Sequence, residues 1–88
     1  MEVIFLKSFL KDLKKVKNKK LKQQVKDAIL EVEKAKTVSE ISNIKKLSGF
    51  LGVYRIRIGS YRIGLYVNDS RVEFARFVKR ADIYKLFP

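Results

Sequence analysis

The stretch Tyr54–Val67, YRIRIGSYRIGLYV, decides the fold because apolar and polar residues alternate along it on both sides of one turn. A period of two is typical of strands that are buried on one face. Gly59 and Ser60 fit a two-residue hairpin loop with glycine in its first position. The stretch therefore predicts two antiparallel strands with an apolar face toward a core and an arginine-bearing face on the other side.

Three arginines of this hairpin share one predicted face. Arg55 and Arg57 lie two residues apart on the first strand, and pairing across the loop places Arg57 opposite Arg62. Like charges directly opposite each other on paired strands are destabilising. The arrangement therefore indicates a surface for a polyanion, and Tyr66 on the same face is a candidate for stacking on a base.

The sequence after the hairpin predicts a third strand and a short helix. Residues 68–70 have turn composition, and residues 71–79 read as a strand. The register of that strand is ambiguous, because strict alternation places Phe74 and Phe77 on opposite faces. Residues 81–87 are expected to form one or two helical turns.

The sequence before the hairpin predicts a strand and two helices. Residues 2–6 read as a short strand, and residues 8–17 carry apolar side chains at helical spacing, with Ser8 as the expected cap. Residues 19–36 form an amphipathic helix, and Thr37–Glu40 matches a capping box. The apolar stripe of the second helix consists of Leu21, Val25, Ala28, Ile29, Val32 and Ala35.

The element order is β-α-α-β-β-β with a short C-terminal helix, which predicts the α+β class. We expect an N-terminal strand and a helical hairpin packed on one face of a mainly antiparallel sheet. A chain of 88 residues suffices for one domain, residues 1–88, with a thin core.

The composition excludes several kinds of chemistry. The chain has no Cys and no His, which removes disulfides, thiol nucleophiles, a histidine base and the usual zinc sites. We therefore expect no metal and no cofactor. The sequence shows no secretory leader pattern and no apolar run that could span a bilayer, so we expect a cytoplasmic protein without a membrane partner.

Positive charge dominates, with a net charge of +12. A protein this basic repels itself unless an anionic partner compensates, and nucleic acid comes before an anionic membrane or an acidic protein. Residues 1–36 hold eleven Lys and no Arg, whereas all six Arg lie between positions 55 and 80. The rigid fork of arginine matches phosphate oxygens, so the second half of the chain is the candidate binding region.

Three segments carry a further pattern: Lys46–Gly49 (KLSG), Tyr54–Ile63 (YRIRIGSYRI) and Phe77–Tyr84 (FVKRADIY). Together with the element order, they resemble the RelE/ParE superfamily of toxins from toxin–antitoxin systems. The resemblance covers nearly the whole chain and is more specific for the superfamily than for one activity within it.

The resemblance implies a toxin that a cognate antitoxin neutralises in a toxin–antitoxin hetero-oligomer. RelE-like members cleave messenger RNA in the ribosomal decoding site without a metal, through attack of a ribose 2′-hydroxyl on the adjacent phosphate. The ribosome and mRNA would then be partners. ParE-like members share the fold but poison DNA gyrase, which is one alternative. A catalytically inactive homologue that binds nucleic acid is another.

By the same resemblance, the site residues take distinct roles. Arg55 and Arg57 would line the RNA, Arg62 and Arg80 would stabilise the phosphate, and Tyr84 would take part in catalysis.

Two departures from the family pattern bear on proton transfer. Lys79 stands where the family often has His, and Arg55 and Arg57 stand where the best-known RNases have Lys. Arginine does not give up its proton in proteins, so Lys79 and Tyr84 are the titratable candidates near the site. Further candidate RNA contacts are Lys45 and Lys46.

Overall fold

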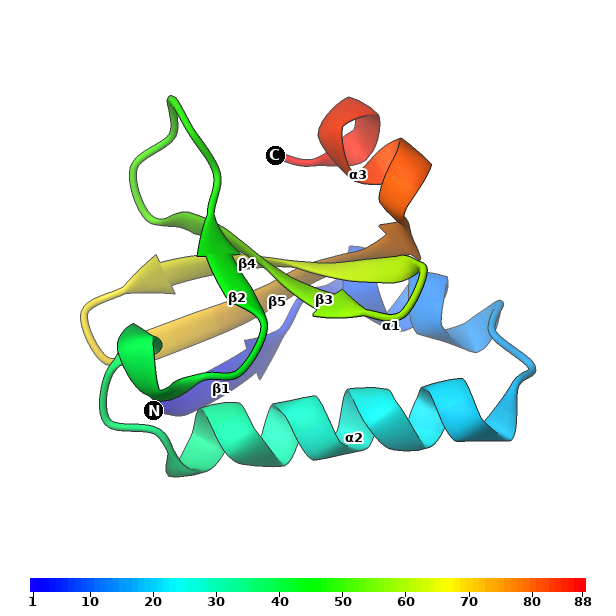
Figure 1. The fold of residues 1–88 in the computed structure, drawn as a ribbon, viewed down its shortest axis with the longest axis horizontal. Helices are drawn as coiled ribbons and strands as arrows, with labels where there is room; N and C mark the ends of the chain where they lie inside the picture. The colour runs from blue at the N-terminus through cyan, green and yellow to red at the C-terminus, as the bar shows by residue number, and fades with distance from the viewer.

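The computed structural model describes residues 1–88 and contains five strands, three α-helices and one 3₁₀ turn (Figure 1). The order is β1 (Glu2–Phe5), α1 (Lys7–Lys14), α2 (Lys19–Lys34), a 3₁₀ turn (Val38–Glu40), β2 (Ile44–Lys46), β3 (Val53–Ile58), β4 (Tyr61–Asn68), β5 (Arg71–Lys79) and α3 (Arg80–Leu86).

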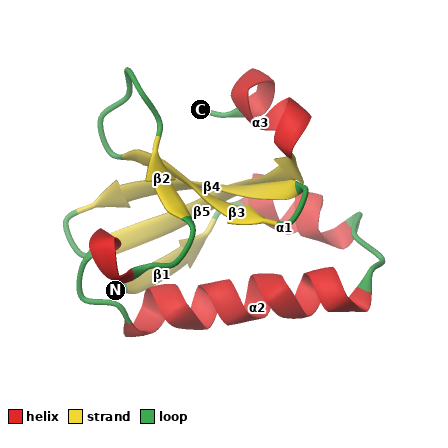
Figure 2. Ribbon diagram, viewed as in Figure 1, coloured by secondary structure: helices red, strands yellow, loops and turns green.

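The five strands form one sheet in the order β1-β5-β4-β3-β2. β1 runs parallel to β5, and every other neighbouring pair is antiparallel. Figure 2 shows α1 and α2 on one side of the sheet and α3 on the other. The predicted α+β class, with a helical hairpin on one face of a mainly antiparallel sheet, is confirmed. None of the helices has the length and apolar character that a membrane crossing requires.

The second helix begins where the sequence predicts and ends two residues earlier. The Asn18 side chain accepts a hydrogen bond from the Leu21 amide at 3.0 Å, which caps the first turn. The predicted stripe faces the sheet, with Val25 and Val32 buried and Ile29 half-buried against the main core. The capping box at Thr37–Glu40 is also confirmed.

The first helix is shorter than predicted, and Ser8 is not its cap. The helix spans residues 7–14, Leu6 occupies the capping position, and the Ser8 hydroxyl donates to the carbonyl oxygen of Ala75. Asp12, one turn later, accepts a hydrogen bond from the Phe77 amide at 2.9 Å. α1 therefore docks on β5 through polar groups as well as through buried Phe9.

These polar contacts mark a β-bulge that corrects the predicted register of β5. Gly64 pairs with Arg76 while Leu65 pairs with Phe74, so Ala75 is an extra residue without a partner. An extra residue reverses the alternation beyond it. Phe74 and Phe77 therefore both reach the main core, although strict alternation places them on opposite faces.

A second, smaller core lies under α3. It contains five buried residues: Leu47, Val53, Ala75, Ile83 and Phe87. Gly64 makes room for it, because a Cβ atom there would lie 2.7 Å from the Phe87 ring. The ring seats the end of α3 on the sheet and so fixes the position of that helix. β2 was not predicted, because its three residues contain one apolar side chain and show no alternation.

Candidate nucleic-acid interface

The six arginines divide into two groups according to their partners. Arg71 pairs with Glu2 at 3.2 Å and Arg76 with Asp12 at 2.7 Å. The other four have no carboxylate within 4.0 Å and come from β3, β4 and the start of α3. Those four are Arg55, Arg57, Arg62 and Arg80, which we call the arginine cluster.

The β3–β4 hairpin places three members of the cluster on one face. Arg57 lies directly opposite Arg62 and Ile58 opposite Tyr61, as predicted from the sequence. Gly59 has φ +57 at the first loop position, which suits the glycine-first turn. The Arg62 guanidinium folds back over this loop and donates to the carbonyl oxygens of Gly59 and Tyr61, at 2.9 and 2.8 Å.

α3 brings the fourth arginine and a tyrosine to the same place. The Arg80 amide donates to the carbonyl oxygen of Ser60 at 2.8 Å, which ties the start of α3 to the hairpin loop. One helical turn later, Tyr84 is 69% exposed. Residues four apart lie on one side of a helix, so the hairpin contact directs both side chains toward the same region.

The electrostatics of Arg62 confirm that these groups lie close together. The pKa of Arg62 is lowered from its ordinary value, first by partial burial of the guanidinium. The next causes are the positive charges of the other cluster members, in the order Arg55, Arg80 and Arg57. Tyr84 acts in the opposite direction. Since arginine stays protonated in proteins, the shift reflects an excess of positive charge rather than a titration.

Two predicted site residues do not join the cluster. Lys79 pairs with Tyr61 on the sheet, and paired residues share a face, so Lys79 lies on the helix-covered side. Tyr66 lies on the same face as Arg62, but its ring packs against Phe87 with centroids 5.0 Å apart. The structure therefore assigns Tyr66 to packing rather than to base stacking, and Lys79 is not placed to act with Arg62.

The two candidate lysines border a hollow of about 450 Å³ beside the cluster. Lys45 pairs with Arg55, which extends the positive row by one strand. In Figure 1 the loop after β2 and α3 rise on the same side of the sheet, with the C-terminus between them. The hollow is lined by Lys45, Lys46, Leu47, Ser48, Phe50, Tyr84, Phe87 and Pro88.

Phe50 is a feature that the sequence analysis missed. The ring is 50% exposed although it is large and apolar, and it belongs to a five-residue loop between β2 and β3. The available signal was an aromatic residue at the tip of a loop between Gly49 and Gly52, where it can have few core neighbours. Such a ring beside lysines is suited to stacking on a nucleobase.

No group of three or more carboxylates, thiols or imidazoles gathers where it could hold a metal ion. The interface therefore offers fixed positive charge, one phenol and apolar surface. Positive charge stabilises phosphate and any further negative charge that develops on it, and the phenol can accept or donate a proton.

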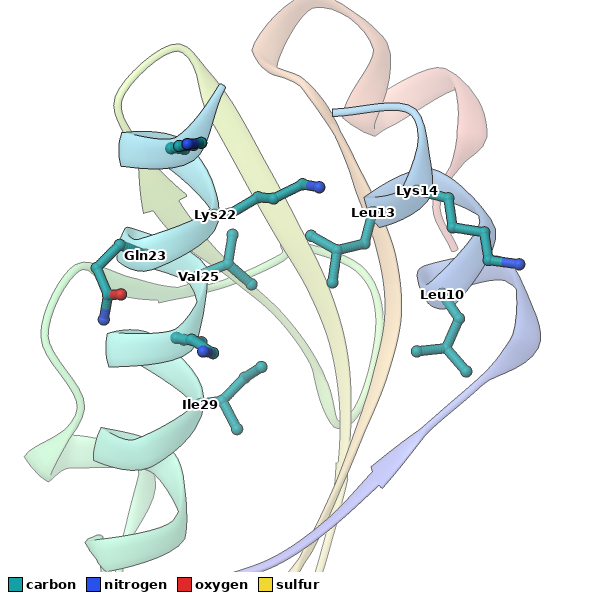
Figure 3. A pocket seen from close by; sticks show the side chains of 9 residues that line it. Leu10, Leu13, Lys14, Lys22, Gln23, Val25 and Ile29 are labelled. Carbon is teal, nitrogen blue, oxygen red and sulfur yellow. The ribbon is translucent and has the colours of Figure 1, made fainter. Parts of the chain in front are cut away.

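An apolar groove of about 590 Å³ lies away from the cluster, between α1 and α2. Figure 3 shows Leu13 of α1 and Val25 and Ile29 of α2 pointing into it from opposite sides, with Lys22 extending from α2 toward α1. Four lysines line the groove: Lys14, Lys19, Lys22 and Lys26. An apolar floor with a positive rim is suited to a partner with the opposite charge.

Known proteins share this sequence and fold. A family model described as "ParE toxin of type II toxin-antitoxin system, parDE" matches residues 3–84. Toxin RelE3 of Methanocaldococcus jannaschii is 39% identical over 89 aligned residues, which cover 100% of both chains.

Solved structures agree with the sequence comparisons. The RelB–RelE antitoxin–toxin complex from Methanococcus jannaschii matches with a TM-score of 0.81 at 38% identity, over 97% of this chain and 99% of that one. The intact RelBE toxin–antitoxin complex of E. coli matches with a TM-score of 0.71 at 26% identity, over 89% and 94% of the two chains.

Proposed function

Because this chain belongs to the RelE/ParE superfamily of toxins from type II toxin–antitoxin systems, we propose that it is a RelE-like endoribonuclease that cleaves messenger RNA on the ribosome. The observation that carries the proposal is the convergence of four arginines without acidic partners beside an exposed tyrosine. Since ribosomes and their mRNA lie in the cytoplasm, the protein would act there.

The first step is binding of the RNA backbone. Arg55 and Arg57 project from the same side of β3, and Lys45 lies directly opposite Arg55 on β2. This row faces solvent and can follow successive phosphates of a single strand. Contacts of this kind are independent of sequence and weaken with salt as counterions are released.

The second step is transfer of the phosphoryl group within the RNA. The ribose 2′-oxygen bonds to the adjacent phosphorus, and the bond from phosphorus to the 5′-oxygen of the next nucleotide breaks. The products are a 2′,3′-cyclic phosphate and a 5′-hydroxyl. Arg62 and Arg80 would stabilise the negative charge that develops on the phosphorane, an effect that is commonly the largest single catalytic contribution.

The proton has one titratable side chain near it in this arrangement. The 2′-hydroxyl must lose a proton and the 5′-oxygen must gain one, and the arginines cannot supply either service. Tyr84 lies within electrostatic range of Arg62 and is open to solvent. We assign the proton to its phenol, with the orientation of the RNA supplied by the ribosome.

The hollow beside Tyr84 gives the substrate a second point of attachment. A base next to the cleaved bond would stack on Phe50, while Lys45 and Lys46 hold its phosphate. Splayed, unstacked bases are the usual target of proteins that recognise RNA.

The test is induced expression followed by mapping of mRNA 5′ ends, with the ends assayed for free hydroxyl groups. The native chain should create new 5′-hydroxyl ends within coding regions. The variant with Arg62→Ala and Arg80→Ala should create none at the same protein level, and Tyr84→Phe should reduce their number by about a hundredfold or more. Full cleavage by the double variant would refute the site.

The matching family model is described as a ParE toxin, which favours one alternative, an inhibitor of DNA gyrase. That activity needs no phosphoryl transfer, so induction would damage chromosomal DNA and leave mRNA 5′ ends unchanged. A purified gyrase supercoiling assay with the native chain distinguishes the two functions directly. An inactive nucleic-acid-binding homologue would show neither effect.

We propose further that a cognate antitoxin binds the groove between α1 and α2. Both solved relatives described above are complexes with an antitoxin. An amphipathic helix with leucines on one face and carboxylates beside them would cover Leu13 and Ile29 and neutralise the lysine rim. Leu13→Asp should weaken such a complex strongly, and Lys7→Glu, on the same helix but outside the groove, should change it little. Equal weakening by both variants would refute this surface.

A further inference from the structure

Asn43 has a backbone conformation that few side chains adopt. Its φ is +61, and Asp69 in the β4–β5 turn, with φ +54, is the other non-glycine residue with positive φ. Asparagine is among the residues that tolerate this left-handed region best. Asn43 lies between the 3₁₀ turn and β2, at the edge of the sheet beside β3.

This conformation turns the polar atoms of Asn43 toward two members of the arginine cluster. The backbone carbonyl oxygen accepts hydrogen bonds from Arg55 Nη1 at 2.9 Å and from the Arg57 amide at 3.1 Å. The side-chain Oδ1 lies 3.4 Å from Arg57 Nη2 and accepts from it. One residue therefore contacts both guanidinium groups.

Asn43 is itself held in place from the helix side of the molecule. The amide and hydroxyl of the preceding Ser42 both donate to Glu31 Oε2 on α2, at 2.9 and 2.7 Å. Glu31 thus fixes the backbone just before the left-handed residue. The direction of the two arginines is in this way linked to the core helix.

The chemistry of these acceptors matters as much as their position. A carboxylate beside Arg57 would hold it more tightly but would cancel the charge that a phosphate must meet. A carbonyl and an amide oxygen are neutral, so they orient the guanidinium groups and leave their charge in place. Each guanidinium has five N–H donors and uses one here, which leaves four for a ligand.

We propose that Asn43 is a positioning residue for RNA binding, which holds Arg55 and Arg57 in one direction against repulsion from Arg62. The inference rests on the proposed function and specifies how the RNA-binding row is preorganised. Long side chains lose rotamer freedom when they bind a ligand, and a group that is already oriented loses less.

The experiment compares Asn43→Gly with Asp69→Gly. Both changes keep a positive φ without strain and add the same backbone freedom, but only the first removes a contact to an arginine. RNA affinity is measured with a short single-stranded RNA by fluorescence anisotropy at several salt concentrations. Mobility of the Arg57 side chain is measured without RNA by ¹⁵N relaxation of its Nε–H group.

Asn43→Gly should raise the Kd for RNA about three- to tenfold, whereas Asp69→Gly should leave it within twofold. The melting temperatures of the two variants should be alike. Asn43→Asp should weaken RNA binding further, because it keeps the geometry but cancels charge. The Arg57 side chain should become more mobile in Asn43→Gly alone.

The outcomes separate this inference from the function on which it rests. If Arg57→Ala weakens RNA binding but Asn43→Gly and Asn43→Asp do not, the positioning role is wrong and the RNA-binding role of the arginines stands. If Arg57→Ala leaves RNA binding unchanged, the proposed RNA interface fails, and the positioning role for RNA fails with it. Unchanged Arg57 mobility in Asn43→Gly overturns the positioning role in either case.

Discussion

The two faces of the sheet use the same strands in different ways. The face under α1 and α2 carries a core of fourteen buried residues that includes Phe9, Phe74 and Ile63. The opposite face has a core of five under α3 and leaves its remaining rows to arginines without acidic partners. Stability is thus concentrated on one face, and the other can carry repelling charges that a structure built for stability alone would avoid.

The largest expected effect comes from breaking the join between α1 and the bulge in β5. The Asp12 side chain is 8% exposed and accepts from Arg76 Nε at 2.7 Å and from the Phe77 amide at 2.9 Å. Asp12→Ala would leave Arg76 and that amide without their partner. We expect a loss of about 3–5 kcal/mol in the free energy of unfolding, measured by urea denaturation.

The exposed pair Arg71–Glu2 is the control for this effect. Its side chains are 54% and 64% exposed, and Glu2→Ala should cost about 0–1 kcal/mol. Similar losses in Asp12→Ala and Glu2→Ala would show that the bulge does not depend on the aspartate.

The second expected effect is on the arginine face and concerns rate. Arg62→Ala should slow RNA cleavage by about 10²–10³-fold under single-turnover conditions, because the lost charge is matched to the transition state. RNA affinity should fall much less, and the fold should remain. Arg71→Ala removes the same charge from an ion-paired position outside the cluster and should leave the rate nearly unchanged. A rate loss no greater than the affinity loss would make Arg62 a binding residue.

The sequence predicted the parts of both faces that follow from periodicity. The helical stripe through Val25 and Val32 and the pairing of Arg57 with Arg62 follow from spacings of 3.6 and 2 residues. The bulge at Ala75 could not be predicted this way, because one inserted residue has no sequence signal of its own and reverses the parity of those that follow.

The site could be predicted to the same extent. Alternation placed Arg55 and Arg62 on one face, but whether a residue on that face is free depends on what packs over it. Tyr66 has the parity of Arg62 and is nevertheless engaged by Phe87, which is 21 residues away in the chain. Lys79 was misplaced by the same bulge. The role of Asn43 depends on a backbone angle that composition does not reveal.

A third, smaller effect distinguishes the two sides of the loop after β2. Phe50 lines the hollow beside Tyr84, whereas its neighbour Leu51 is 94% exposed and borders a different depression. Phe50→Ala should weaken RNA binding by about 1–3 kcal/mol, the usual contribution of one stacked base. Leu51→Ala should have no measurable effect on RNA binding. Both changes should leave the melting temperature nearly unaltered, and equal RNA affinities would exclude base stacking on Phe50.

The smallest expected effect has the opposite sign on the two properties of the arginine face. The pKa of Arg62 is lowered by burial and then by Arg55, Arg80 and Arg57, so its charged form is less favourable in the folded chain than in the unfolded one. A lowered pKa of a cationic group means a penalty that persists at every pH below that pKa. It therefore stays constant through the physiological range, and salt rather than pH should relieve it.

Arg57→Gln removes the charge directly opposite Arg62 and keeps a polar side chain near Asn43. We expect it to raise the free energy of unfolding by about 0.2–1 kcal/mol at low salt and to reduce the gain in stability on adding salt. RNA binding should weaken at the same time, with a salt slope smaller by about 0.7 for the lost phosphate contact. Urea denaturation and RNA titration over one salt series measure both. A variant that is less stable than the native chain and binds RNA equally well would show that Arg57 serves the fold rather than the ligand.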